Sequence, residues 1–244
     1  MDKIDKQVYY KYLKPHELIE KIRQCPVAYL PLGTLEFHGF HLPLGADGLQ
    51  SEAFFTDLAN EIGGVVLPML FLGPSPVKIS GDIELHGSDI PCDMQLPGSL
   101  YRVSDETFSI IIEQTVRLTA RAGFKILVAH GHGPSNAFLF DIKEHLEKKY
   151  NIIIMNCWHE IPDRDHAFMD DHAAANETSI MMHYYENLVD MDLLPKDLNE
   201  WPLAVAGEDP RIKASVEIGT SAIKYNLMKM KERIQETLNF IHGE

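Results

Sequence analysis

The sequence predicts an α/β fold: one domain over residues 1–244, built on a mostly parallel sheet with helices on both faces. Short apolar runs of strand length alternate with segments in which apolar residues recur at helical spacing. Strands that alternate with helices usually lie parallel in one sheet, and the connecting helices cover its two faces. The length of 244 residues and the hydrophobic fraction of 45% are sufficient for one large core.

Four apolar runs predict buried strands, and helical patterns lie between and after them. The strands are predicted at residues 27–32, 65–67, 125–129 and 152–156. The helices are predicted at residues 15–24, 51–62, 106–123, 137–149, 173–187 and 218–242. Pro15 stands at the first position of its helix, which tolerates proline, and Ser104 is a good N-cap for the helix that ends near Gly123. Phe54 and Leu58 are spaced as on one face of a helix.

Three further segments are expected to lack regular structure. Residues 73–98 are rich in Gly, Pro, Ser and Asp, residues 163–172 are polar, and residues 195–210 are loop-like. Long irregular segments are uncommon inside compact domains and often belong to binding or lid elements. We therefore expect residues 73–98 to contribute to a binding site or to contacts between subunits.

Composition excludes several classes of protein. The net charge of −14 argues against a binder of nucleic acid or of anionic membranes. No apolar run approaches the roughly 20 residues that cross a bilayer, and the charged amino end lacks the apolar centre of a secretory signal. The three cysteines (Cys25, Cys92 and Cys157) are far apart and form no CxxC pair. A reduced cytoplasm is the simplest setting, and a zinc site made of thiolates is not expected.

Polar residues follow the predicted strands where ligands of a parallel sheet bind, outside the carboxyl ends. Glu36 and His38 come shortly after strand 27–32, and their side chains leave the same face of an extended segment. His130 and His132 follow strand 125–129 directly. Further candidates are Asp47, His172 and Glu177. Carboxylates and imidazoles without sulfur indicate a site for a first-row metal, with Zn²⁺ and Mn²⁺ as the best candidates.

Three motifs resemble those of the creatininase (creatinine amidohydrolase) family. The family signature is close to Gly-x-x-Glu-x-His-Gly-x-His-Leu-Pro-x-x-x-Asp. It is matched by Gly33, Glu36, His38, Gly39, His41, Leu42, Pro43 and Asp47. A second motif is matched by His130-Gly131-His132-Gly133 with Asn136, and a third by the run from His172 to Ser179 that contains Glu177. A weaker match at residues 96–99 makes Gly98 and Ser99 candidates for substrate binding.

This resemblance implies a three-layer α/β/α fold, hydrolysis of an amide and, often, a hexamer. It implies two divalent ions per subunit, Zn²⁺ or Mn²⁺ with Fe²⁺ as a further possibility. Glu36 and His132 would hold one ion, His38 the other, and Asp47 would bridge them. Two such ions can share a hydroxide that attacks the carbonyl. His172 is the candidate general acid for the leaving nitrogen, His130 is catalytic or structural, and His41 binds substrate or orients its neighbours.

The sequence departs from creatininase itself beside His132. Creatininase has a tyrosine and a metal-binding glutamate where this chain has Gly133 and Pro134, so we expect Glu177 to complete the second site and creatinine not to be the preferred substrate. The main prediction is an amidohydrolase for a small cyclic or linear amide. The alternatives are a deformylase for a formylamino-pyrimidine, a peptidase for a small modified peptide, and a metal- or ligand-binding protein that has lost turnover.

Overall fold

The centre of the molecule is a sheet of four parallel strands in the order β2-β1-β5-β6. The computed structural model describes residues 8–161 and 168–243. The strands are β1 (Val27–Leu32), β2 (Val65–Val66), β5 (Ile126–Gly131) and β6 (Ile153–Met155). β1 and β5 pair along their whole length, from Val27 opposite Ile126 to Leu32 opposite Gly131. The prediction of a parallel α/β sheet is confirmed.

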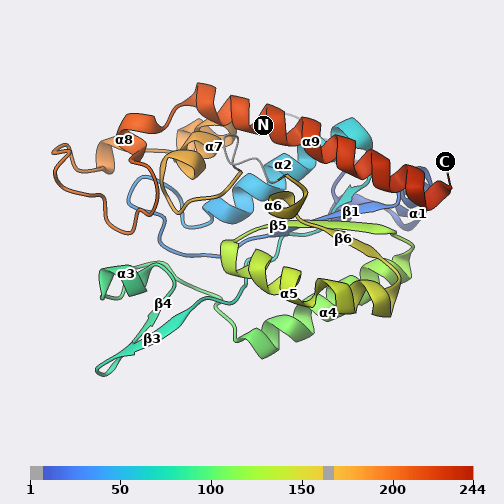
Figure 1. Ribbon diagram of the computed structural model, residues 1–244, viewed down its shortest axis with the longest axis horizontal. Helices are drawn as coiled ribbons and strands as arrows, with labels where there is room; N and C mark the ends of the chain where they lie inside the picture. Colours follow the sequence, from blue (N-terminus) through green and yellow to red (C-terminus); the bar gives the residue numbers. More distant parts are fainter. Residues whose placement is uncertain (1–7, 162–167, 244) are drawn as a thin grey trace.

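Helices cover both faces of the sheet and make three layers (Figure 1). One layer contains α2 (Ala46–Ile62), α7 (Ala175–Tyr185) and α9 (Val216–His242); the other contains α4 (Asp105–Ala122) and α5 (Gly133–Tyr150). Successive residues of a strand point to opposite faces, so both faces of β1 are buried. Tyr29 packs in the cluster that contains Phe54 of α2, whereas Leu30 packs in the cluster that contains Phe108 of α4. The apolar runs of the sequence are continuous because both faces require them.

Two helices begin earlier than the sequence indicated, and this changes the position of functional residues. The helix predicted from residue 51 begins at Ala46, so Asp47 lies in the first turn of α2 rather than in a loop. The helix predicted from residue 137 begins at Gly133, with Pro134 in its first turn, where the missing N–H costs nothing. Strand β5 extends to Gly131, so His130 lies inside the strand and not after it.

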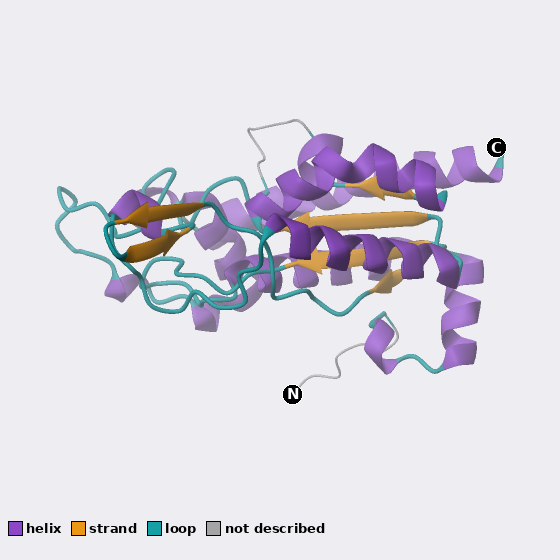
Figure 2. Cartoon of the chain, turned by 90° about the horizontal axis from the view of Figure 1, so that it is seen from below, coloured by secondary structure: helices purple, strands orange, loops and turns teal. Residues whose placement is uncertain are grey.

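The prediction that residues 73–98 are irregular is wrong. They contain an antiparallel hairpin of β3 (Val77–Ser80) and β4 (Ile83–His86), followed by α3 (Asp89–Cys92). Gly81 has a φ of +61° in the two-residue turn that joins these strands. The hairpin projects from the end of the molecule toward which the arrowheads of the central strands point (Figure 2).

The remaining elements agree with the sequence more closely. Helices α1 (Pro15–Gln24), α4 and α9 lie where they were predicted within two residues, and Ser104 caps α4 by accepting from the Thr107 backbone N–H. Helix α7 is shorter than predicted, α6 (Cys157–Glu160) and α8 (Pro210–Lys213) are short additions, and the described residues also contain three 3-10 turns. Half of the predicted polar section 163–172, residues 163–167, lies outside the described residues. Over the described ranges, none of the helices is both long and apolar enough to cross a bilayer.

Candidate metal centre

The site lies at the carboxyl ends of β1 and β5, where the sheet changes its direction of growth. From β1 the chain passes first to β2 on one side and later to β5 on the other, and ligands of parallel sheets bind at such a point. The His132 N–H donates to the Leu32 carbonyl at 2.7 Å, which joins the segments that leave the two strands. Gly131 has a φ of +147°, and a Cβ there would lie 1.8 Å from the Leu32 oxygen, so only glycine permits this approach.

Two groups of possible metal ligands share one carboxylate. The first group is Glu36, Asp47 and His132, and the second is His38, Asp47 and Glu177; within each group the ligand atoms all lie within 4.8 Å of one another. Asp47 Oδ2 lies 3.2 Å from His132 Nδ1 and 3.6 Å from His38 Nε2. All five side chains are buried. Because a carboxylate has two oxygens, Asp47 is suited to contact two cations at once.

Backbone carbonyls orient the imidazole rings. His38 Nδ1 lies 3.1 Å from the carbonyl oxygen of Glu36, and His132 Nε2 lies 3.1 Å from that of Pro74. A carbonyl oxygen only accepts, so each of these nitrogens carries the hydrogen. The other nitrogen, Nε2 of His38 and Nδ1 of His132, then points toward the carboxylates, where either a proton or a metal ion can occupy it. This is how metal-binding histidines are usually oriented.

Glu177 lies in the first turn of α7 and reaches the same centre. Its Oε2 is 3.8 Å from His38 Nε2 and accepts from the Ala173 backbone N–H at 2.7 Å. Asp171 accepts from the backbone N–H groups of Asn176 and Glu177 at 2.7 and 3.0 Å, and these bonds cap the start of the helix. The expected position of Glu177, near the amino end of this helix and beside the loop that carries His172, agrees with the structure.

The buried histidines and carboxylates of the centre shift one another's pKa values. Burial would lower the pKa of His38, but the carboxylates of Asp47 and Glu177 outweigh it and raise that pKa to about 10. Burial and the nearby charge of Asp47 raise the pKa of Glu177 well above its ordinary value. Burial acts in the same direction on Asp47, yet His38 and His132 hold its pKa well below the usual range. In the metal-free protein, protonated imidazoles offset the negative charge of these buried carboxylates. The same negative charge attracts divalent cations.

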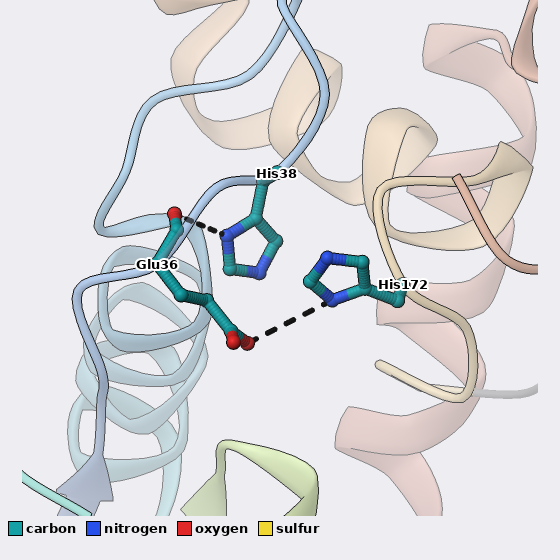
Figure 3. A group of neighbouring side chains, drawn as sticks. All are labelled: Glu36, His38 and His172. Carbon is teal, nitrogen blue, oxygen red and sulfur yellow. Dashed lines mark hydrogen bonds and ion pairs between the residues drawn. The ribbon is translucent and has the colours of Figure 1, made fainter. Parts of the chain in front are cut away.

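His172 borders the centre from the side of the cavity. Its Nε2 lies 2.9 Å from the Phe37 carbonyl oxygen, and its Nδ1 lies 3.7 Å from Glu36 Oε1. Figure 3 shows its ring beside that of His38, with centroids 4.5 Å apart. Burial and the charge of His38 lower the pKa of His172, so the ring is neutral near pH 7. Glu36, His38 and His172 also form a third group with metal-ligand spacing.

A cavity of about 580 Å³ opens onto the centre. Glu36, Asp47, His132, His172 and Glu177 lie in its wall. Among residues 8–161 and 168–243, no lysine or arginine lines it. Its volume is that of a site for a small organic molecule.

Four of the residues singled out in the sequence lie away from this cavity. His130 is buried against Phe168 and Trp158, with ring centroids 5.2 and 5.4 Å away, and burial lowers its pKa to about 4. His41 is also buried, and its Nε2 pairs with Thr178 Oγ1 at 2.9 Å. Gly98 and Ser99 do not line the cavity. In the described structure these four residues therefore lie outside the cavity lining.

The cavity also contains residues that sequence reasoning did not identify. Trp201, Leu203 and Val205 line it, and they come from the section expected to be a loop. A tryptophan followed by proline in a long loop was the available signal, and it is a weak one. The roles of the Phe37 and Pro74 carbonyls in orienting histidine rings cannot be read from the sequence, because every residue has the same main-chain oxygen.

Comparison with known proteins assigns the class of enzyme. The family model described as "Creatininase: Creatinine amidohydrolase" matches residues 11–221. Creatinine amidohydrolase of Pseudomonas putida is 26% identical over 185 residues, which cover 68% of this chain and 67% of that protein. A crystal structure of creatinine amidohydrolase (creatininase) superposes with a TM-score of 0.74 at 22% identity, covering 94% of this chain and 97% of that one.

A second relative shares less of its length. The 3-dehydro-scyllo-inosose hydrolase of Thermotoga maritima is 25% identical over 163 residues, and the match spans 64% of this chain and 47% of that protein. The fold, the centre and the family match define a hydrolase that acts on C–N bonds other than ordinary peptide bonds. More particularly, the chain belongs to the creatininase family. The resemblance seen in the sequence is confirmed.

Proposed function

We propose that this chain is a metal-dependent amidohydrolase that cleaves a C–N bond of a small cyclic or linear amide. The observation that carries the proposal is the sharing of Asp47 by two groups, each with one further glutamate and one histidine. Under this proposal each subunit binds two divalent ions. Zinc and manganese are the preferred candidates because the ligands are nitrogen and oxygen, and Fe²⁺ is a further possibility. Solved creatininases of the same fold are described as a Zn-Zn type and as a manganese form, which supports this choice.

The donor atoms present in the chain fit such ions. His38 Nε2 is fully buried and makes no well-formed hydrogen bond to any described residue. A buried nitrogen of this kind is costly unless a cation occupies its lone pair. Glu36, Asp47 and His132 would hold one ion, and His38, Asp47 and Glu177 the other. When bound, two divalent ions would polarise the amide carbonyl and lower the pKa of water.

His172 is the proposed proton carrier. Its Nε2–H is held by the Phe37 carbonyl, so Nδ1 is the atom that takes up a proton and passes it to the leaving nitrogen. The lowered pKa of His172 leaves Nδ1 free to accept that proton near pH 7. His172→Asn should therefore retain full metal content and lower kcat by roughly 10²–10⁴-fold. A variant that loses one ion per subunit would instead identify His172 as a ligand.

The lining of the cavity favours an uncharged or cationic substrate. Asp170 and Asp171 line the cavity in addition to the proposed metal ligands, and negative charge there opposes an anion. The described lining offers no ammonium or guanidinium to pair with an anion. The assay is hydrolysis of a panel of cyclic amides, formamides and small modified peptides by metal-loaded protein, with and without a chelator. Cleavage restricted to formamides would favour the deformylase, and cleavage restricted to peptides the peptidase. Metal binding without cleavage of any compound would favour the binding protein.

We further propose that the chain acts in the cytoplasm as a homo-oligomer, with a hexamer as the first expectation. On the projecting hairpin, Val77 and Ile79 share one face and are 41% and 65% exposed, and Ile83 on the other face is 40% exposed. Large apolar side chains exposed together on one hairpin are typical of a contact surface. Light scattering at micromolar concentration tests the assembly, and a monomeric mass would contradict it.

A further inference from the structure

The section between α7 and α8 forms one side of the cavity. Residues 195–209, called here the wall segment, place Trp201, Leu203 and Val205 in the cavity lining. In Figure 1 this segment is the orange chain beside α8, on the same side of the molecule as α3. We propose that the wall segment selects the substrate: Trp201 contacts its non-reacting part, and Arg211 is the positioning residue that holds the segment in place. This inference rests on the proposed function.

Arg211 binds the wall segment at several points. Its Nη1 donates to the carbonyls of Pro195, Asp197 and Glu200 at 2.9, 3.0 and 3.0 Å. Its Nε and Nη2 donate to the carboxylate of Asp209 at 2.9 and 2.7 Å. The side chains of Arg211 and Asp209 are only 9% and 11% exposed. A planar guanidinium with five fixed donors can join separate carbonyls in this way, and lysine cannot reproduce the arrangement.

The wall segment is also joined to His172. The His172 N–H donates to the Ala206 carbonyl at 3.0 Å, and the Ala206 N–H donates back at 2.9 Å. Gly207 adopts a φ of +151°, and a Cβ there would lie 2.7 Å from Ala174 Cβ. This close approach fixes the wall segment against the start of α7, so its position and that of the proposed proton carrier are set together.

Trp201 is suited to contact a ligand. Its Nε1 donates to the Val205 carbonyl at 2.9 Å, so the polar atom of the indole is satisfied within the wall segment. The side chain is nevertheless 52% exposed and lines the cavity. A fixed, half-exposed indole offers a flat apolar surface at little further entropic cost. With the apolar side chains of Leu203 and Val205 beside it, the wall favours substrates whose non-reacting part is flat or apolar and carries no negative charge.

Binding of two hydroxamates to the zinc-loaded full chain tests this inference without requiring turnover. Both compounds have the same metal-binding group, but benzohydroxamate adds a phenyl ring where acetohydroxamate has a methyl group. We expect benzohydroxamate to bind about tenfold more tightly by calorimetry, a difference of about 1.4 kcal/mol. Trp201→Ala should remove this preference and leave the affinity for acetohydroxamate unchanged, whereas Trp201→Phe should keep most of it.

Arg211→Lys and Arg211→Gln test the positioning role. Both should lose most of the preference for benzohydroxamate, retain full zinc content, and shift the tryptophan emission to longer wavelength as Trp201 loses its fixed position. Arg117→Gln is the matched control, because the guanidinium of Arg117 on α4 donates to Gln114 within the same helix and Arg117 does not line the cavity. If Arg211 only stabilises the fold, its variants will have a lower Tm but an unchanged hydroxamate preference.

Other outcomes overturn the inference. Equal affinities of wild type for the two hydroxamates would show that the wall segment does not contact the ligand, as would a preference retained in Trp201→Ala. Failure of the zinc-loaded wild type to bind either compound would refute the metal centre of the proposed function, and the inference with it. The Trp201→Ala result remains decisive if the Arg211 variants do not fold, because the half-exposed indole contributes little to the core.

Discussion

Glu177→Gln separates a metal ligand from a residue that only supports a helix end. In the metal-free protein, burial and the charge of Asp47 raise the pKa of the Glu177 carboxyl well above its ordinary value and so favour its neutral form, which glutamine resembles. We therefore expect the free energy of unfolding to change little. Gln still offers an oxygen to the Ala173 N–H. With metal present the variant should differ sharply, because it lacks the negative charge that the second group supplies against a cation.

The effect can be estimated from linkage. Free metal at about 100 times its Kd stabilises the folded state by about 2.7 kcal/mol, and a hundredfold weaker affinity leaves about 0.4 kcal/mol. The loss of about 2.3 kcal/mol corresponds to a Tm lower by about 5–9 °C for a chain of this size. We expect elemental analysis to find one ion fewer per subunit, and thermal denaturation to show the Tm difference only when metal is present.

The control is Glu217→Gln, which removes an exposed acid from the first turn of α9. A helix-end role costs about 0.3–1 kcal/mol with or without metal. Full metal loading of Glu177→Gln, or a Tm loss that is the same in chelator and in zinc, would refute the reasoning.

Three further predictions follow from the site and the core. Gly133 and Pro134 replace the tyrosine and glutamate of creatininase beside the centre, so kcat/KM for creatinine should fall below roughly 10⁴ M⁻¹s⁻¹; a higher value in steady-state assays contradicts this. Zinc binding should release protons at pH 8, because the pKa of His38 is raised to about 10 without metal. Calorimetry in buffers of different ionisation enthalpy measures this release. Binding heats that do not depend on the buffer would disprove it. Phe108→Ala should cost about 3–5 kcal/mol in urea denaturation, because Phe108 of α4 is fully buried against the sheet, and a cost below 1 kcal/mol would show that the core refills the space.

The sequence was sufficient to predict the strands of the central sheet, because burial requires those strands to be apolar. A strand such as Val27–Leu32, covered on both faces, has to be a continuous apolar run, and such runs are visible without a structure. The hairpin of β3 and β4 had its own signal in the Gly81-Asp82 turn and the alternation from Val77 to Ser80. That signal was outweighed by the surrounding glycines and prolines, which are equally typical of irregular loops.

The starts of helices were harder to predict for a local reason. The N-cap of α2 is Gly45, which has no side chain to accept a hydrogen bond, and Gly48 in the first turns is a poor helix former. Tertiary contacts override these preferences: Gly48 lies against Gly33, where a Cβ would be 3.3 Å from the Gly33 Cα. The placement of Asp47 beside His38 and His132 depends on this packing, which no local pattern encodes.

The candidate metal ligands could be predicted from the sequence, but the residues that line the cavity or hold its lining in place could not. Glu36, His38, Asp47, His132 and Glu177 stand out because carboxylates and imidazoles are rare at the ends of buried strands and within buried helices. Trp201 and Arg211 do not stand out, because an aromatic residue in a predicted loop and an arginine just after that loop are ordinary surface features. Their roles depend on which carbonyls the guanidinium reaches, and that is decided only by the folded chain.

The orientation of His38, His132 and His172 by main-chain carbonyls has a consequence for how this enzyme can diverge. Side chains around the cavity can be exchanged without rotating the rings, because main-chain carbonyls accept from one N–H group of each ring. Reactivity then depends on the path of the backbone, and selectivity depends on replaceable side chains. One scaffold of this kind can acquire new substrates through mutations in its loops while the reaction that it performs stays the same.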